Sequence, residues 1–434
     1  MDKMADVLGR AGAWCGQNKY LSAIKNAFQN FMPLTIAGAI GVLWCNVLVN
    51  DQTGLGLFFK PIMALDFLNP AFQAVNFCTI SCITVGITLG IAQEIGVWNM
   101  GAERAGYIPG LVGLAAWLSV TNTSHMVEGA KEAFTGIAGN ELGATGLFTG
   151  MIIGVLSVEL FCFFEKQDAL KIKMPEQVPP GVARAFEVLV PATITLIITA
   201  CIGSACYNLT GLYLNDVIKN GIQGPLGAVG ATIPGVMIIY LVIMLFWLVG
   251  IHGNNMLSAV KEALFTPLAL ENVEKFNKGE KPTNIINMYA LQMWGEFGGS
   301  GVTIGLVIAI MIFGKREDNK AIATLSLVPG LFNINETVTF GIPMVLNPIL
   351  GIPFVVAPLI TIIIGYVLTV IGFCPVACLT VPWTTPPIVF GFLACGANVM
   401  GAVTQAILIV VSTVIYTPFL ISYEKYQNKQ AAEA

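Results

Sequence analysis

Charged side chains are scarce in this 434-residue sequence, where Asp, Glu, Lys and Arg together make up 11%, against the roughly 25% typical of a soluble domain. Hydrophobic residues make up 56% and the mean hydropathy is +0.77, so the chain cannot cover itself with a polar surface. These values exclude a soluble enzyme, a disordered scaffold and a secreted disulfide module. They indicate an all-α polytopic membrane protein, with room for about eight to ten crossings of about 20 residues each.

Basic runs and nucleotide-handling motifs are also missing. The net charge is −4, so nucleic acid is not expected as a partner. The sequence contains no phosphate-binding loop, zinc motif or nucleophile elbow. We therefore expect no cofactor, no metal site, no ATP hydrolysis and no covalent intermediate on this chain. Nine of the ten cysteines lie in apolar stretches, which favours packing roles over metal binding.

The loops between the apolar segments predict the orientation of the chain. The loop from Lys166 to Arg184 is rich in Lys and Arg, and the positive-inside rule places it in the cytoplasm. The basic segment 1–31, predicted to be amphipathic, and the tail 424–434 fit the same side, so both termini are expected there. The mixed-charge segment Lys261–Thr283 is predicted to be a cytoplasmic amphipathic stretch. Counting the membrane crossings along the chain places the charged loop 315–320 on the external side, although the positive-inside rule disfavours that side for it.

The apolar segments predict two bundles, an N-terminal one at 32–212 and a C-terminal one at 213–423. Prolines interrupt the apolar segments in the last third of the chain. Non-helical backbone inside a bilayer persists only when it is buried in protein or lines a wet cavity. Transporters build binding sites from such broken segments. We therefore predict re-entrant hairpins at 321–346 and around 252–290.

Two titratable residues stand isolated in this region. Glu336 is the only Asp, Glu, Lys, Arg or His between residues 321 and 423, and His252 is the only one between 220 and 260. A charge in a membrane costs about 2.5–3.5 kcal/mol on insertion scales, so such residues face a cavity or a partner. His252 is followed by Gly253, Asn254 and Asn255, and Glu336 is preceded by Asn333 and Asn335. This composition predicts a site for an uncharged ligand with many hydroxyl groups.

Aromatic rings complete a sugar site, because a pyranose has an apolar face that stacks on a ring. Trp383 is the best candidate, since prolines open the backbone beside it, and Trp247 and Trp294 follow. Glu296 is a third acid in or near the membrane that can border the pocket. The alternatives are an interfacial anchor for each tryptophan, a carbonyl-bound structural role for His252, and a proton-relay or structural role for Glu336.

Three sequence blocks carry a family resemblance. The run from Phe332 to Glu336, continuing through Pro343, resembles the signature of the lactose/cellobiose/N,N′-diacetylchitobiose family of membrane IIC components. These permeases belong to the bacterial phosphoenolpyruvate-dependent sugar phosphotransferase system. The runs Val381–Pro387 and His252–Asn255 resemble two further family blocks. The chain departs from the family at Thr337, where proline is frequent, and at Cys395–Ala397, where Thr-Gly-Gly is frequent.

The resemblance implies ten transmembrane helices and two re-entrant hairpins in the bacterial inner (plasma) membrane, in a homodimer whose interface lies in the bundle 32–212. It implies a disaccharide of the diacetylchitobiose or cellobiose type, bound between His252 and Glu336 in the half 213–423. It also implies alternating access and a cytoplasmic phospho-IIB protein that phosphorylates the sugar 6-hydroxyl, with no catalysis by this chain alone. His252 and Glu336 would position that hydroxyl.

Two other classes of function are weighed against this one. In a proton- or sodium-coupled disaccharide symporter, Glu336 would titrate during transport. An intramembrane hydrolase fits the sequence poorly, because no pair of aspartates and no Ser/His pair is placed for catalysis.

Overall fold

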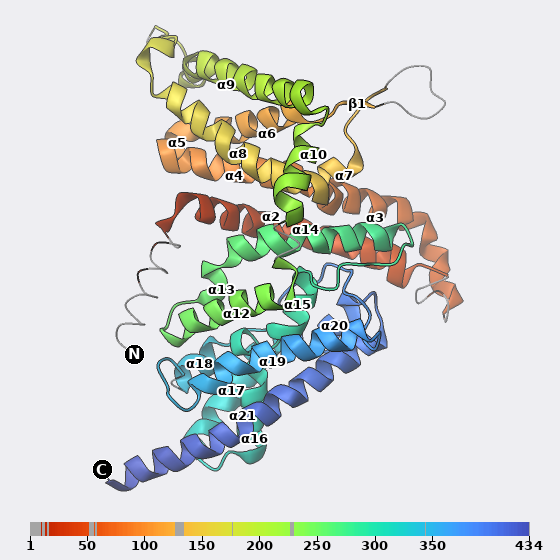
Figure 1. Cartoon of the computed structure of the whole chain (residues 1–434), viewed down its shortest axis with the longest axis vertical. Helices are drawn as coiled ribbons and strands as arrows, with labels where there is room; N and C mark the ends of the chain where they lie inside the picture. Colours follow the sequence, from red (N-terminus) through yellow and green to blue (C-terminus); the bar gives the residue numbers. More distant parts are fainter. Residues whose placement is uncertain are drawn as a thin grey trace. The chain divides into compact units, whose positions relative to one another are not determined.

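The computed structural model describes residues 17–51, 56, 59–125, 134–175, 177–225, 230–342 and 344–433, together with Arg10 and Trp14. These residues are predominantly helical (Figure 1). The strands among them are the two-residue β1 (Ser124–His125) and β2 (Phe134–Thr135), which pair antiparallel. The predicted all-α class is confirmed.

Five helical segments in the described part of the chain are long and apolar enough to cross a membrane, and the number rises to seven if each of two bent helix pairs forms one span. The five are Lys19–Leu48, Ala144–Glu165, Pro180–Thr210, Gly351–Val370 and Val399–Glu433. A helix of 20 residues is about 30 Å long, which matches the hydrocarbon core of a bilayer. The chain is thus a multi-pass membrane protein, and the number of ten crossings remains an expectation from the resemblance.

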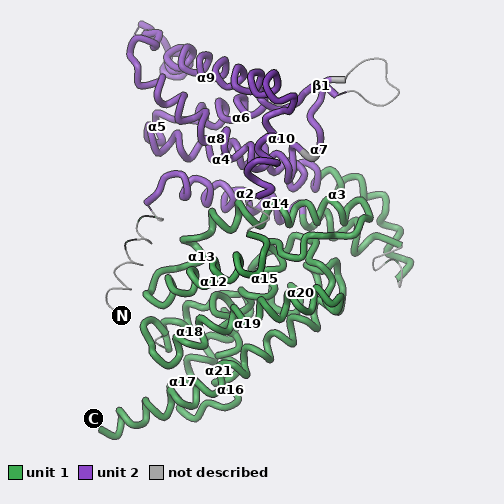
Figure 2. Tube along the Cα trace, in the orientation of Figure 1, with its two compact units in different colours: residues 1–16, 39–74, 229–434 green, residues 17–38, 75–228 purple. Residues whose placement is uncertain are grey.

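The chain divides into two compact units (Figure 2). Unit 1 comprises 1–16, 39–74 and 229–434, and unit 2 comprises 17–38 and 75–228. The four unit boundaries fall after residue 16, within α2 (Lys19–Leu43), within α3 (Asn69–Asn76) and after residue 228. The boundary expected at 212 therefore lies inside unit 2.

Unit 2 is built on long apolar helices. The helices α4, α6 and α8 pack against one another, and α9 packs against α6 and α8. The elements of this unit are α4 (Ile83–Met100), α5 (Ala102–Ala105), α6 (Ile108–Val120), α7 (Gly139–Leu142), α8 (Ala144–Glu165), η5 (Asp168–Leu170), α9 (Pro180–Thr210), α10 (Leu214–Ile218) and η6 (Lys219–Gln223), preceded by η4 (Phe77–Ser81).

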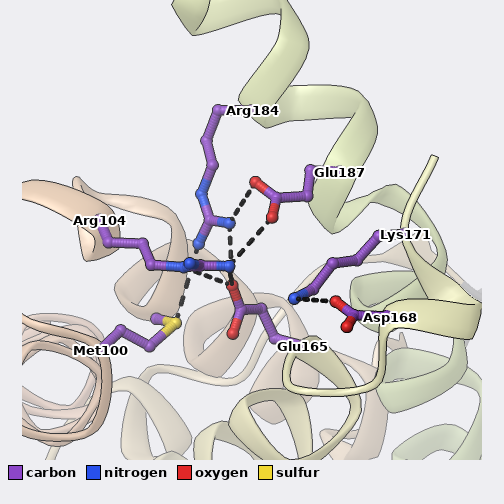
Figure 3. Close-up of polar contacts among 7 residues, drawn as sticks. All are labelled: Met100, Arg104, Glu165, Asp168, Lys171, Arg184 and Glu187. Atoms are coloured by element: carbon purple, nitrogen blue, oxygen red, sulfur yellow. Dashed lines mark hydrogen bonds and ion pairs between the residues drawn. The ribbon is translucent and has the colours of Figure 1, made fainter. Parts of the chain in front are cut away.

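An ion-pair cluster joins three helices of unit 2 (Figure 3). Glu165, the last residue of α8, has a side chain that is 3% exposed, and its Oε1 accepts from Arg104 Nε of α5 and from Arg184 Nη1 of α9, both at 2.9 Å. Glu187 pairs with both arginines, at 3.0 Å and 2.8 Å. Two carboxylates therefore balance two guanidinium groups at the point where the three helices meet.

Unit 1 carries the isolated titratable residues. Its longest helix, α21, packs against α16, α19 and α20. The elements are η1 (Trp44–Leu48), η3 (Lys60–Leu68), α12 (Ile233–Leu248), α13 (Gly253–Met256), α14 (Ser258–Asn277), α15 (Met288–Gly295), η7 (Ser300–Val302), α16 (Ile304–Phe313), α17 (Glu317–Leu331), α18 (Glu336–Gly341), α19 (Gly351–Val370), α20 (Val389–Ala394) and α21 (Val399–Glu433).

The helical backbone is interrupted in both segments predicted to form hairpins. Within 321–346, α17 ends at Leu331 and α18 begins at Glu336, which gives two helices joined by a short turn. Within 252–290 the 20-residue helix α14 continues through Pro267, because α14 contains no glycine and many strong helix formers. The chain is non-helical at 278–287, and α15 then begins at Met288. That either segment re-enters the membrane stays a prediction. Another irregular stretch lies between α19 and α20, where the prolines after Cys374 interrupt the chain.

The contact between α20 and α21 depends on two glycines. A Cβ atom at Gly401 would lie 2.2 Å from the carbonyl oxygen of Gly391, and one at Gly391 would lie 2.5 Å from that of Gly401. Backbone atoms cannot rotate away as a side chain can, so an added methyl group must push the helices apart.

We expect Gly401→Ala to lower the free energy of unfolding by about 1–3 kcal/mol, which is typical of overpacking. Thermal unfolding of the purified protein in detergent measures the loss. The matched control is Gly181→Ala, where a Cβ atom meets nothing within 4 Å. Equal unfolding temperatures for the two variants would contradict the close approach.

Candidate functional site

His252 and Glu336 lie close together in unit 1, although they are far apart in the sequence. His252 Nε2 lies 3.7 Å from Glu336 Oε1. The two side chains are 38% and 46% exposed, so a ligand can reach both. The separation exceeds the range of a direct hydrogen bond.

The imidazole of His252 is held in a defined orientation. Its Nδ1 accepts a hydrogen bond from the backbone N–H of Asn255 at 3.3 Å, which caps the start of α13. A neutral imidazole that accepts at Nδ1 carries its hydrogen on Nε2, the atom that faces Glu336. The ring centroid lies 4.4 Å from that of Trp247, whose side chain is 1% exposed, so Trp247 supports the histidine from the core.

The residues after His252 have distinct roles. Gly253 is buried, and a Cβ atom there would lie 2.0 Å from the carbonyl oxygen of Ile243. Only glycine therefore lets α13 pack this closely against α12. Asn254 is half-buried and Asn255 is exposed, so both amide side chains lie beside the histidine and remain open to a ligand.

Asn333 connects three segments around Glu336. Its Oδ1 accepts from the backbone N–H of Gly298 at 2.6 Å, and its Nδ2 donates to the carbonyl oxygens of Trp383 and, at 3.1 Å, of Thr385. The backbone of Asn333 has φ +62°, a left-handed conformation that asparagine tolerates better than most residues. Its amide is thus fully engaged in holding the segments that border Glu336.

Asn335, the residue directly before α18, has a similar structural role. It is 4% exposed, and its Nδ2 donates to Ser300 O at 3.0 Å and to Thr339 Oγ1 at 3.1 Å. Its amide group therefore acts inside the protein, by fixing the start of α18 at Glu336.

Of the three candidate tryptophans, Trp247 and Trp294 are buried and only Trp383 is exposed. Trp383 is 45% exposed and its carbonyl group is bound by Asn333, so its ring is available for stacking beside the site. Trp294, on α15, is 1% exposed, and a Cβ atom at Gly365 would lie 2.4 Å from its ring. The large apolar area of Trp294 is buried in the core, so its ring is not exposed to a ligand in this structure.

Replacing Asn333 tests how the site is held. Asn333→Ala removes all three hydrogen bonds. We expect both the unfolding temperature and the sugar affinity to fall, because each hydrogen bond contributes about 1 kcal/mol of net stability. Asn333→Asp keeps the acceptor for Gly298 but loses both donors to the carbonyl groups, so an intermediate loss is expected. Thermal unfolding and sugar binding measure the two effects. If Asn333→Ala retained wild-type stability, the bridging role would be wrong.

One buried polar cluster of unit 1 was not predicted from the sequence. Lys261, expected on a cytoplasmic amphipathic stretch, is 5% exposed and pairs with Glu296, which also accepts from Tyr240. Its neighbour Glu262 is half-buried, and its carboxylate accepts from the Thr266 hydroxyl. The mixed charges along this helix predicted a solvated face, whereas Lys261 is buried against Glu296, which only the packing reveals. The cytoplasmic placement of the segment stays a prediction.

A metal centre is not indicated. Within the described ranges, no group of three or more His, Cys, Asp or Glu side chains is arranged to hold a metal ion.

Comparison with known proteins gives consistent similarities. The family model for "Phosphotransferase system, EIIC" matches residues 25–358. An oligo-beta-mannoside-specific EIIC component of a PTS system from Bacillus subtilis (strain 168) is 32% identical over 429 residues, covering 98% of this chain and 94% of that protein. A cellobiose-specific EIIC component from Lactococcus lactis subsp. lactis (strain IL1403) is 30% identical, with 98% of each chain covered.

A solved structure is similar over nearly the whole chain. The transporter ChbC, the IIC component from the N,N′-diacetylchitobiose-specific phosphotransferase system, superposes with a TM-score of 0.88 at 29% identity, covering 97% of each chain.

Proposed function

This chain belongs to the EIIC family of membrane sugar permeases of the phosphotransferase system, and on that premise we propose that it takes up a disaccharide of the cellobiose or diacetylchitobiose type. The similar proteins named above are specific for cellobiose, oligo-beta-mannosides and N,N′-diacetylchitobiose. All of these sugars are β-linked and uncharged, and they differ mainly in the groups on the ring. A site rich in amides and poor in charge suits this class.

The observation that carries the proposal is the gap between His252 and Glu336. A separation of 3.7 Å is too long for the two groups to bond directly. A hydroxyl group is both donor and acceptor, so one sugar hydroxyl can accept from His252 Nε2–H and donate to Glu336. The exposed ring of Trp383 offers a stacking surface close to the same segments.

The reaction that makes uptake directional takes place on that hydroxyl. A IIB protein carrying phosphocysteine supplies the phosphoryl group from the cytoplasm. The sugar 6-hydroxyl oxygen forms the new P–O bond, the S–P bond breaks with release of the thiolate, and the hydroxyl proton passes to Glu336, since His252 Nε2 already carries its hydrogen. The neutral sugar becomes a dianion and is trapped inside. This chain contributes binding, positioning and the proton acceptor.

The membrane arrangement belongs to the same proposal. We place the chain in the bacterial inner (plasma) membrane as a homodimer with both termini in the cytoplasm. The bundle 32–212 contributes the dimer interface, and the half 213–423 moves against it to give alternating access.

Binding of labelled cellobiose and N,N′-diacetylchitobiose to the purified protein tests the proposal. We expect binding to wild type and at least a tenfold loss in His252→Ala and in Glu336→Ala. Uptake into vesicles without a phosphoryl donor separates this function from its rival. Uptake driven by a proton or sodium gradient alone would favour a coupled symporter with Glu336 as the titrating group.

A further inference from the structure

Two buried cysteines of unit 1 lie in contact with each other. The sulfur atoms of Cys374 and Cys395 are 3.9 Å apart, and the two residues are 1% and 4% exposed. Both are free cysteines in this structure. They are 21 positions apart in the sequence, so the tertiary fold brings them together. The function proposed above gives this pair no role.

The surroundings keep the two sulfur atoms side by side. Both thiols donate to the carbonyl oxygen of Pro375, at 3.4 Å from Cys374 and 3.3 Å from Cys395. The sulfur of Cys395 also lies 3.9 Å from that of Met293. A Cβ atom at Gly401 of α21 would lie 2.9 Å from Cys395 Sγ, so this helix leaves the thiol little room to turn away from its partner.

The stretch 374–395, which has one of these cysteines at each end, borders the proposed sugar site. It contains Trp383, whose ring is exposed there and whose carbonyl oxygen accepts from Asn333 Nδ2. The stretch is folded back on itself near its ends, because the carbonyl oxygen of Ala394 accepts from the backbone N–H of Cys378 at 2.7 Å. A covalent link between the two ends would therefore act on the segment that presents Trp383.

We propose that Cys374 and Cys395 are a redox pair that hydrogen peroxide converts into a disulfide, and that this disulfide weakens sugar binding, an effect that rests on the proposed function. One thiolate attacks a peroxide oxygen, the O–O bond breaks, and a sulfenic acid and water form. The second thiol attacks the sulfenic sulfur, the S–S bond forms, and a second water molecule leaves. The two sulfur atoms lose two electrons to the peroxide, and the two thiol protons end in the two water molecules.

Closing this bond must displace the ends of the stretch. A disulfide has an S–S distance of about 2.05 Å, so the present separation of 3.9 Å roughly halves. Protein interiors are close-packed and transmit such a shift, and the segment with Trp383 moves with its ends. The stretch is non-helical from 375 to 388, and segments of this kind open locally at a lower free energy than core helices. Such opening admits a small neutral oxidant to the buried thiols.

Peptide mapping of the purified full-length protein after peroxide treatment tests the pair. No Lys or Arg lies between residues 321 and 423, so trypsin leaves both cysteines in one peptide, whereas chymotrypsin, which cleaves after Trp383, separates them. We expect a linked pair of chymotryptic peptides that contains Cys374 and Cys395 and that dithiothreitol separates. Binding of labelled cellobiose should weaken roughly tenfold on oxidation, because a misplacement of about 1 Å at a site can cost up to about 100-fold, and it should recover after dithiothreitol.

Cysteine variants separate this pair from other oxidised residues. Cys374→Ala and Cys395→Ala should bind cellobiose like the reduced wild type and should keep that affinity after peroxide treatment. Cys378→Ala is the matched control, because Cys378 is 3% exposed and lies in the same stretch. It should form the link and lose affinity as the wild type does.

Absence of the link at every peroxide concentration that leaves the protein folded overturns the redox pair. A link that leaves binding unchanged, or an equal loss of affinity in Cys374→Ala, overturns its effect on the site. If the alanine variants do not fold, the mapped link in the wild type and the recovery of binding with dithiothreitol decide. Failure of the reduced wild type to bind cellobiose or diacetylchitobiose would instead overturn the proposed function, while peptide mapping would still decide whether the disulfide forms.

Discussion

Glu336→Gln is expected to lower the rate of sugar phosphorylation by roughly 10²–10⁴-fold, the range typical of a lost general base, while sugar affinity falls far less. Glutamine keeps a carbonyl oxygen that can accept from the sugar hydroxyl, so the bridge between His252 and residue 336 survives. It cannot take the hydroxyl proton as the P–O bond forms. Phosphoryl transfer from purified phospho-IIB protein and equilibrium binding of cellobiose measure the two quantities separately.

The comparison with Glu336→Ala sharpens this result. Alanine removes both the acceptor and the base, so binding and phosphorylation should fall together. Glu274→Gln, at an exposed carboxylate of α14 that pairs with Lys278, should leave both unchanged. Parallel losses of binding and rate in Glu336→Gln would show that Glu336 only binds the sugar, and wild-type rates would remove it from the site.

Glu165→Gln should destabilise unit 2 more than any other single charge change in that unit. Glu165 has a side chain that is 3% exposed and accepts from both Arg104 and Arg184. Without its charge, two guanidinium groups share Glu187 alone. Breaking a buried pair by removing one partner costs about 3–5 kcal/mol, and because the Arg104 side chain is 48% exposed we expect the lower end of that range. Thermal unfolding of the purified protein measures the loss.

The matched control for Glu165→Gln is Glu317→Gln. Glu317 pairs with Lys320 at 3.1 Å, but its side chain is 87% exposed, and such surface pairs contribute about 0–1 kcal/mol. We expect no measurable change in unfolding temperature. Similar losses in both variants would mean that burial does not set the cost, and an unchanged Glu165→Gln would contradict the bridging role of the cluster.

Several features of the fold follow from local sequence alone. Scarce charge and long apolar runs require helices in a bilayer, because backbone groups must be satisfied within each segment. The break between α17 and α18 and the irregular chain after α19 follow from glycine, proline and asparagine, which do not continue a helix. Within 252–290 the one proline among strong helix formers does not break α14, and the interruption comes at 278–287, where Gly279 has φ +73°.

By itself, the sequence determined that this is an all-α membrane protein, and that His252 and Glu336 stand alone in long uncharged stretches, because the cost of a charge in lipid acts on each residue separately. Only the tertiary structure decided that these two side chains lie 3.7 Å apart, that Trp294 belongs to the core, and that Lys261 faces Glu296 inside the protein. Contacts between distant segments depend on how helices pack, and a one-dimensional pattern cannot distinguish a charged residue facing water from one facing a buried partner.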